Sequence, residues 1–218
     1  MSIKFDKYEI NNDGKRLYII VPKKVLSELY VCEIDSNRHI IFGDKTSLYD
    51  LAIIVNSLKN NPNYILYIPS KKKTTEYLSS CWRCDTAFDL VIVHHSVQLK
   101  IKTWKNIRQK LNQKDTLSLE ENIISYPNFE KYSFVENKDI LVAKSRFDTL
   151  FLVGSDLIFS VMAFQCEDIS SSGEGIFRES RSHTHAHLDM CFNYKVHRSG
   201  KERLTIEYYD KTLWLGNR

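Results

Sequence analysis

The chain has 218 residues, of which 43% are hydrophobic and 27% charged, and its formal net charge at pH 7 is +4. These proportions are typical of a globular domain, and 7 Gly and 4 Pro are too few for a disordered or low-complexity chain. The positive excess is too small to indicate a nucleic-acid partner by itself. No apolar run approaches the ~18 residues of a membrane span, and residues 1–10 lack the apolar core of a signal peptide.

The cysteines and the chain length indicate the cellular compartment and the number of domains. The five cysteines follow no tight framework, which is typical of reduced thiols in a cytoplasmic protein. The length corresponds to a single domain over residues 1–218, and the polar, weakly patterned stretch 112–138 is the candidate for a subdomain connector. We therefore expect a cytoplasmic protein without a membrane partner.

The first half of the chain alternates strand patterns with helix patterns. A helix is predicted after Gly43, where Ser47 and Asp50 have the spacing of a capping box and an apolar stripe follows. The continuous apolar run 90–93 predicts a central, buried strand, and a basic helix is predicted at 103–111. Further strands are predicted at 15–21, 29–34, 38–42 and 64–68.

The second half repeats this order of elements. Strands are predicted at 140–143 and 149–153, and Ser155 caps a helix that runs to residue 169. The Ser- and Gly-rich stretch 170–175 is predicted to end that helix as a flexible loop. These strand–turn–helix units predict an α/β or α+β fold, a mixed β-sheet with two to four packed helices and a C-terminal antiparallel hairpin.

The most informative stretch is residues 183–196, HTHAHLDMCFNYKV. Alternate side chains of a strand point to opposite faces of a sheet, and from Ala186 onward one of these two faces is entirely apolar. We expect the apolar face to pack on the preceding helix, because the connection between them is short. The opposite face concentrates residue types that bind metals or transfer protons, namely His183, His185, His187, Asp189, Cys191, Asn193 and Lys195.

A hairpin is predicted between this strand and the last apolar run of the chain. Pairing Val196 with Leu204 keeps the apolar side chains of both strands on one face and leaves a turn around Gly200. The same register places Asn193 opposite Glu207. A shift by one residue would turn the histidines inward.

Two neighbouring histidines of such a strand can share a metal ion. Residues i and i+2 lie ~6.6 Å apart and residues i and i+4 ~13 Å apart, so all three histidines cannot bind one ion without a bend. A zinc site would use His185 with His187, or His183 with His185, and Asp189 or a second-strand residue such as Glu207 as a further ligand. The alternative is a solvated outer face on which histidine is simply tolerated.

The histidine stretch also resembles two known signatures. Its Thr184–Asp189 segment is similar to the T-H-x-H-x-D-H motif of metallo-β-lactamase-fold hydrolases, and its His-x-His is similar to the opening of amidohydrolase barrels. The final histidine of the first motif is Met190 here, and few residues follow to supply the further ligands of that fold. The second motif belongs on the first strand of a long barrel. Neither family is therefore assigned.

A second group of polar residues directly follows the predicted strands. In open α/β sheets, ligands collect beyond the carboxyl ends of parallel strands. If the three strand–turn–helix units were parallel neighbours, an acid/base cleft faced by helix N-termini would form there. Its members would be Asp44, His94, His95, Ser96, Ser155 and Asp156.

Two further motifs have ordinary structural explanations. Cys81 and Cys84 have the spacing of a redox pair or half a zinc site, but no apolar strand precedes them and no second C-x-x-C completes a four-sulfur site. The basic residues between Lys100 and Lys114 have the charge to contact phosphates. The outer face of an amphipathic helix explains them without a nucleic acid, so we do not expect a nucleic-acid partner.

Two functions remain open at this point. The lack of a complete catalytic signature or a cofactor loop favours a non-catalytic protein-binding module, such as an inhibitor or a toxin-immunity-type protein. Such a module would need no cofactor, and its partner would be another protein. The alternative is a metal-dependent hydrolase or nuclease that holds a divalent transition metal on the strand face of His183, His185, His187 and Asp189.

Overall fold

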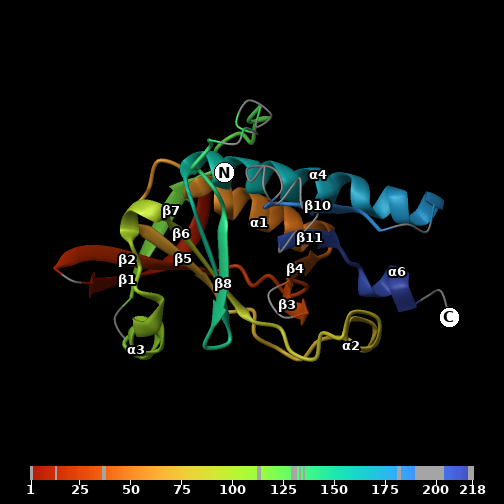
Figure 1. Ribbon diagram of the computed structural model, residues 1–218, viewed down its shortest axis with the longest axis horizontal. Coiled ribbons are helices and arrows are strands. Elements are labelled where there is room, and N and C mark those ends of the chain that lie inside the picture. Colours follow the sequence, from red (N-terminus) through yellow and green to blue (C-terminus); the bar gives the residue numbers. More distant parts are fainter. Residues whose placement is uncertain are drawn as a thin grey trace.

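The structure is a computed structural model that describes residues 2–12, 14–35, 38–111, 114–128, 132, 134, 136–180, 183–189 and 204–215. Within these ranges the chain forms two mixed β-sheets and five α-helices, which confirms the predicted mixed α/β class (Figure 1). None of the described helices is long and apolar enough to cross a membrane. The helices are α1 (Lys45–Ser57), α2 (Glu76–Trp82), α3 (Trp104–Gln109), α4 (Asp156–Ser180) and α6 (Lys211–Leu215).

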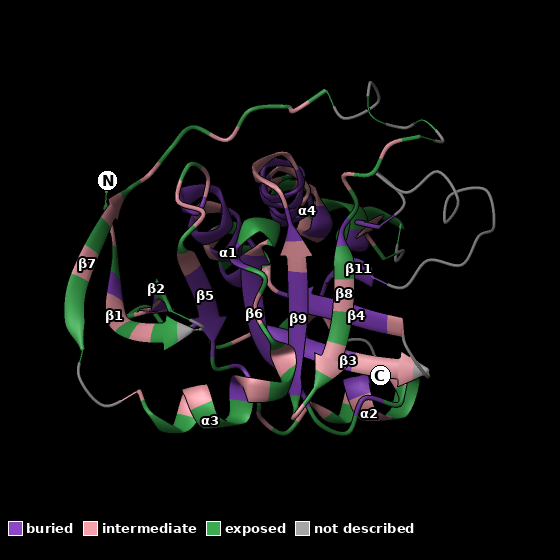
Figure 2. Cartoon of the chain, turned by 60° about the vertical axis from the view of Figure 1, so that its left-hand side comes forward, coloured by how far each residue is buried: buried purple, intermediate pink, exposed green. Residues whose placement is uncertain are grey.

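The larger sheet has seven strands, with parallel pairs β2–β5 and β6–β9 and antiparallel pairs elsewhere. Figure 2 shows that β5, β6 and β9 at its centre are buried, whereas the edge strands β7 and β8 carry many exposed residues. In spatial order the strands are β7 (Asp115–Glu120), β1 (Ser2–Asn12), β2 (Lys15–Pro22), β5 (Tyr64–Ile68), β6 (Asp89–His94), β9 (Thr149–Gly154) and β8 (Val142–Arg146).

Two strands of this sheet were not predicted from the sequence. Strand β7 lies inside the stretch 112–138, for which a connector was predicted. Strand β1 forms a hairpin with β2 that turns at Gly14, whose φ is +80°. Asp-Gly between two strands is a common hairpin signal, so the sequence does contain a local indication of β1.

The smaller sheet carries the histidines. Its spatial order is β10, β11, β4 and β3, and β11 runs parallel to β4 while the other two pairs are antiparallel. Separate sheets had not been expected. The bounds are β10 (His185–His187), β11 (Leu204–Tyr208), β4 (Arg38–Gly43) and β3 (Tyr30–Asp35).

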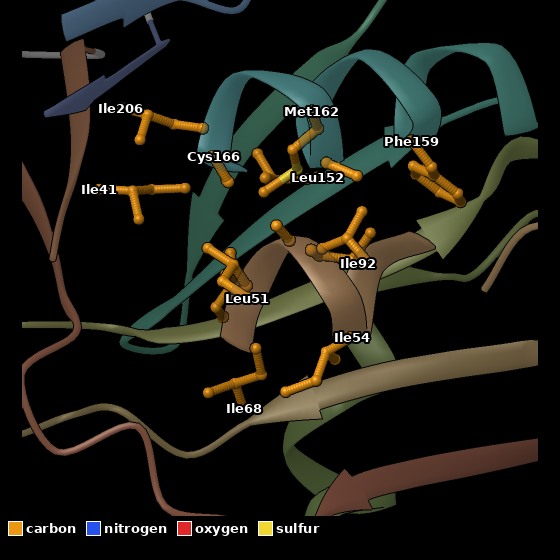
Figure 3. Close-up of a cluster of buried hydrophobic side chains, with 14 of the residues drawn as sticks. Ile41, Leu51, Ile54, Ile68, Ile92, Leu152, Phe159, Met162, Cys166 and Ile206 are labelled. Carbon is orange, nitrogen blue, oxygen red and sulfur yellow. The ribbon is translucent and has the colours of Figure 1, made fainter. Parts of the chain in front are cut away.

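The main core lies where α1 and α4 pack side by side against one face of each sheet (Figures 1 and 3). Ile92 of the larger sheet, Ile206 of the smaller sheet, Leu51 of α1 and Met162 of α4 all belong to this cluster. Leu188, directly after β10, belongs to it too and is 1% exposed. The expected packing of the histidine strand on the helix after Ser155 is therefore confirmed.

Each sheet is also covered on its second face. The buried Trp104 of α3 packs against the larger sheet, beside Tyr67 and Phe151. On the smaller sheet, Phe42 and Tyr209 pack with residues of α2 and α6. The outer face of the smaller sheet is thus apolar toward β3 and becomes polar toward β10.

Helix α4 continues through the stretch 170–175, where a loop was predicted, so that prediction is wrong. The serine side chains are satisfied within the helix. The Ser170 hydroxyl donates to the Glu167 carbonyl at 2.7 Å, and the Ser172 hydroxyl donates to the Asp168 carbonyl at 2.8 Å. Gly173 faces β11, where an added Cβ would lie 2.3 Å from the Tyr208 ring. Tertiary packing has therefore overridden the local loop preference.

The predicted hairpin exists as an antiparallel pair of β10 and β11, but its predicted register is wrong. His185 lies opposite Glu207, and the Leu188 N–H donates to the Leu204 carbonyl at 3.0 Å. The predicted partner of Leu204, Val196, and the turn around Gly200 lie outside the described residues. The difference is an even number of residues, so the histidines keep their predicted outward direction.

Candidate functional site

The histidines of β10 line a small pocket on the outer face of the smaller sheet. Strand alternation places Ala186 and Leu188 inward against the core, and His185 and His187 outward. The side chain of Glu207 points to the same outer face, because it pairs directly with His185. The pocket has a volume of about 110 Å³ and is lined by Arg38, Ile40, Trp82, His183, His185, His187, Thr205 and Glu207.

The imidazole rings of this pocket are close together. The Nε2 atoms of His185 and His187 are 3.0 Å apart, and their ring planes are at 81°. His183 stacks on His185 with a centroid separation of 4.9 Å. On the other side, Thr205 Oγ1 lies 3.4 Å from Nδ1 of His187. In this arrangement the Nε2 atoms of His185 and His187 point toward each other.

Glu207 is the most unusual group of the pocket. Its side chain is only 3% exposed, and it has no hydrogen bond or ion pair with any described residue. Burial raises the pKa of Glu207 to about 8, because the carboxylate loses its hydration without gaining a partner. A cation that enters the pocket would lower the pKa of Glu207 again, because it favours the ionised carboxylate.

The predicted metal ligands are only partly assembled. Across the described ranges, no three His, Cys, Asp or Glu side chains are placed to hold one metal ion. Asp189 lies in the turn after β10 and is 7% exposed. The pair of His185 and His187 is the part of the predicted set that the fold brings together, and metal binding with Asp189 stays a prediction, as does hydrolysis.

The second predicted site lies at the carboxyl ends of β6 and β9, which are parallel neighbours. His94 pairs with Gly154, so the turns after both strands meet. The Ser155 hydroxyl donates to Asp139 at 2.7 Å and accepts from the Ile158 N–H at 3.3 Å, as an N-cap of α4. Asp139 was not predicted as a member of this site, because it comes from the connection before β8.

His94 and its neighbours are engaged in local structure. Its Nδ1 lies 2.7 Å from Ser96 Oγ and accepts from the Ser96 N–H at 3.3 Å, which caps a short 3-10 turn. Burial and the adjacent His95 lower the pKa of His94, whereas Asp156 and Asp139 act in the opposite direction. His94 and Asp156 therefore interact electrostatically, and the acid/base cleft stays a prediction.

Asp44 does not belong to that cleft, so this part of the prediction is wrong. It follows β4, which lies in the smaller sheet rather than beside β6 and β9. Its carboxylate accepts from the Ser47 N–H at 2.7 Å and caps α1, a role that the sequence had assigned to Ser47. Two of the three strand–turn–helix units are therefore parallel neighbours, and the third is not.

The Cys81 and Cys84 thiols are not arranged as a redox pair. Cys81 is exposed, whereas Cys84 is buried beyond the end of α2, where Arg83 takes a left-handed conformation. A hydrogen bond from Cys84, followed by burial, raises the pKa of Cys32. The close thiol neighbour of Cys84 is therefore Cys32 of β3 rather than Cys81.

A large cleft along α1 was missed by the sequence analysis. It has a volume of about 930 Å³ and lies beside the starts of α1 and β1. Tyr49 and Ile53 are four residues apart, outside the predicted buried stripe, and this spacing was the available signal. We call it the α1 cleft. Its lining consists of Ser2, Ile3, Lys4, Lys23, Lys24, Lys45, Thr46, Tyr49, Asp50, Ile53, Ile54, Glu121, Glu167, Ser170 and Ser171.

The chain was compared with protein-family models, with curated proteins and with solved structures, and none of the three comparisons gave a match. Among the described residues, the histidine pocket and the α1 cleft are the two candidate functional sites.

Proposed function

We propose that this chain is a non-catalytic protein-binding module, an inhibitor or toxin-immunity-type protein, whose partner docks in the α1 cleft. The size and lining of that cleft carry the proposal. Its volume of about 930 Å³ combines apolar side chains of α1 and β1 with a rim of four lysines. None of the described residues that line it is His or Cys, and its carboxylates are Asp50, Glu121 and Glu167.

Exposed apolar side chains continue beyond the cleft. Tyr49 of α1, in the lining, is 46% exposed. Val25 follows Lys24 of the rim and is 81% exposed, and Ile123 lies two residues after Glu121 and is 93% exposed. A pocket for a small molecule encloses its apolar groups, whereas a protein interface spreads them over a wider surface. Tyrosine is also a frequent anchor of such interfaces.

The rim charges favour an acidic partner segment. Lys24 is neutralised by Asp50 at 2.8 Å, and Lys23 lies 3.5 Å from Asp6. Lys4 and Lys45 form no ion pair within the described part of the chain, so their charges are available to a partner. We expect the docked segment to combine apolar side chains with Asp or Glu.

The cleft is held in a fixed shape by its surroundings. Its α1 wall packs along α4 in the main core. The Asn56 side-chain amide donates to the Asn122 carbonyl at 2.9 Å, which ties the segment after β7 to α1. A preformed surface loses little conformational freedom when it binds, which supports docking without a folding step.

The partner can be identified by site-specific crosslinking. A photoreactive amino acid at position 49 should capture one protein from the source cell, and the same group at Asn106 of α3 should not. Asn106 is an exposed control because α3 covers the opposite face of the larger sheet. Equal capture at both positions would overturn the docking site.

Binding of the identified protein can then be measured with matched lysine variants. Lys45→Glu should weaken binding at least tenfold, because it places a carboxylate on the rim where an acidic segment docks. Lys105→Glu makes the same charge change in the first turn of α3 and should leave binding unchanged. Tyr49→Ala should weaken binding by at least thirtyfold, on the order of a hot-spot residue. Unchanged binding of the position-45 and position-49 variants would contradict the proposal.

A further inference from the structure

We propose that His185 and His187 together bind one divalent transition-metal ion at an open site, with water completing the shell and the Glu207 carboxylate accepting a hydrogen bond from that water. The ion belongs to the class that prefers imidazole, namely Zn²⁺, Ni²⁺ or Cu²⁺. This inference is independent of the proposed docking of a partner in the α1 cleft, because the two sites share no lining residue.

The separation of the two ring nitrogens fits two ligands of one ion. The Nε2 atoms of His185 and His187 are 3.0 Å apart. With metal–nitrogen bonds of about 2.05 Å, two ligands at 90° are about 2.9 Å apart and two tetrahedral ligands about 3.3 Å apart. The observed distance lies between these values, so only small side-chain movements are needed to seat an ion.

The surroundings of His187 favour the required tautomer. Thr205 Oγ1 lies 3.4 Å from its Nδ1. A proton on Nδ1, donated toward the threonine oxygen, leaves Nε2 of His187 unprotonated, as metal binding requires, and the ion would replace the present contact between the two Nε2 atoms. Histidines in metal sites are commonly oriented by a hydrogen bond of their second ring nitrogen. Position 205 is thus placed to orient His187, although it would not touch the ion.

Glu207 supplies an independent indication of a bound cation. It lies directly opposite His185, lines the same pocket and is 97% buried without a hydrogen bond or ion pair to any described residue. Buried polar groups in folded proteins nearly always have a partner. A metal-bound water would provide the donor that this carboxyl lacks. Since no three ligand-type side chains among the described residues can reach one ion, Glu207 is assigned to the water and not to the metal.

The charge of the pocket sets the expected strength of binding. Arg38 also lines it, and its guanidinium repels a cation while Glu207 attracts one. With two neutral nitrogens and these opposing charges, the site should bind in the micromolar range rather than as tightly as a closed structural zinc site. Mg²⁺ and Ca²⁺ require several oxygen ligands, so they should not compete.

The test is calorimetric titration of metal-free full-length protein with Zn²⁺. One ion should bind, and His185→Ala and His187→Ala should each weaken binding at least a hundredfold. The matched control is the double variant His94→Ala/His95→Ala, which removes another adjacent pair of rings, 4.3 Å apart, outside the pocket. The control should bind like the natural chain. Loss of binding in the control, or retention in the His185 and His187 variants, would overturn the site.

Glu207→Gln and the spectrum of bound Cu²⁺ test the finer assignment. The glutamine variant should bind Zn²⁺ about tenfold more weakly, as expected for a residue that acts through a bound water. The electron paramagnetic resonance spectrum of one equivalent of Cu²⁺ should show splitting from two nitrogens. An unchanged affinity of the glutamine variant would remove Glu207 from the site, and a spectrum without nitrogen splitting would remove the histidines.

Discussion

Two buried carboxyls of this protein have nearly the same exposure and opposite surroundings. Asp89 of β6 is 5% exposed, and its oxygens accept from the Tyr67 hydroxyl at 2.8 Å, the Lys71 N–H at 3.0 Å and the Arg108 guanidinium at 2.9 Å. Glu207 of β11 is 3% exposed and has no such partner among the described residues. Asp89 is therefore a structural carboxyl, whereas Glu207 destabilises the fold when ionised and so marks a site where a ligand is expected.

Introducing a further buried carboxyl is the strongest test of this contrast. Leu188→Asp would place a charge at a position that is 1% exposed, on the inward face of the strand that carries the histidines. Its cost should exceed about 4 kcal/mol and yield insoluble protein, because the described residues of the main core, to which Leu188 belongs, form an apolar cluster.

Leu188→Met is the control, since it keeps an apolar side chain of similar volume and should express as soluble protein. A soluble Leu188→Asp variant with a normal melting temperature would show that this face is not part of the core.

Removing the partnered carboxyl should have the next largest effect. Asp89→Ala leaves Tyr67 and Arg108 without their common acceptor and should lower the free energy of unfolding by about 3 kcal/mol. Urea denaturation measures this difference. Adding Arg108→Met should recover part of the loss, because no uncompensated charge then remains; a double variant less stable than Asp89→Ala would contradict this explanation.

The pH dependence of stability should show the opposite behaviour of Glu207. Its pKa is about 8 in the fold against 4.5 for the exposed group, so the unfolded chain releases the proton first as the pH rises. The contribution of Glu207 to the free energy of unfolding is therefore fully present below pH 4.5 and declines between pH 4.5 and 8.

Glu207→Gln, measured without metal, should match the natural chain at pH 4 and be more stable at pH 8 by about 1–3 kcal/mol. This range is smaller than the full shift implies, because the pocket is open enough to admit water. Parallel stability curves for the two proteins between pH 5 and 8 would show that Glu207 ionises freely in the fold.

Metal removal should have the smallest effect on stability. An open two-nitrogen site contributes little to folding, so a strong chelator should change the melting temperature by no more than about 2 °C. Thermal melts with and without the chelator provide the measurement. A large drop would mean that the ion holds the fold together, and would make the cysteines and histidines candidates for one structural site.

The sequence predicted local features better than long-range arrangement. The alternation after His183 correctly placed His185 outward and Leu188 inward, because a strand has a fixed period of two. The predicted register was wrong, because residues 190–196 continue the same apolar alternation and several pairings satisfy it. The assignment of β4 to a separate sheet, which excluded Asp44 from the cleft, depends on packing between distant segments that no local pattern records.

The candidate sites show the same division. The residue types of the histidine pocket were visible in the chain, and Glu207 was considered as a second-strand ligand. The sequence did not show that Glu207 is buried without a described partner. That burial depends on residues of α2 and β4 that line the same pocket. The α1 cleft was missed because the exposed Tyr49 and the half-buried Ile53 look like ordinary helix surface until β1 and the segment after β7 stand beside them.

The absence of one side chain in α4 has a consequence at a distance. Gly173 lets Tyr208 of β11 approach so closely that a methyl group would collide with its ring at 2.3 Å. Tyr208 and Glu207 are adjacent on β11 and point to opposite faces of the sheet. By letting Tyr208 approach α4, the glycine fixes how far β11 lies from the helix, and with it the position of the Glu207 carboxyl on the outer face. A larger residue at position 173 is therefore expected to shift β11 and with it the Glu207 carboxyl of the histidine pocket.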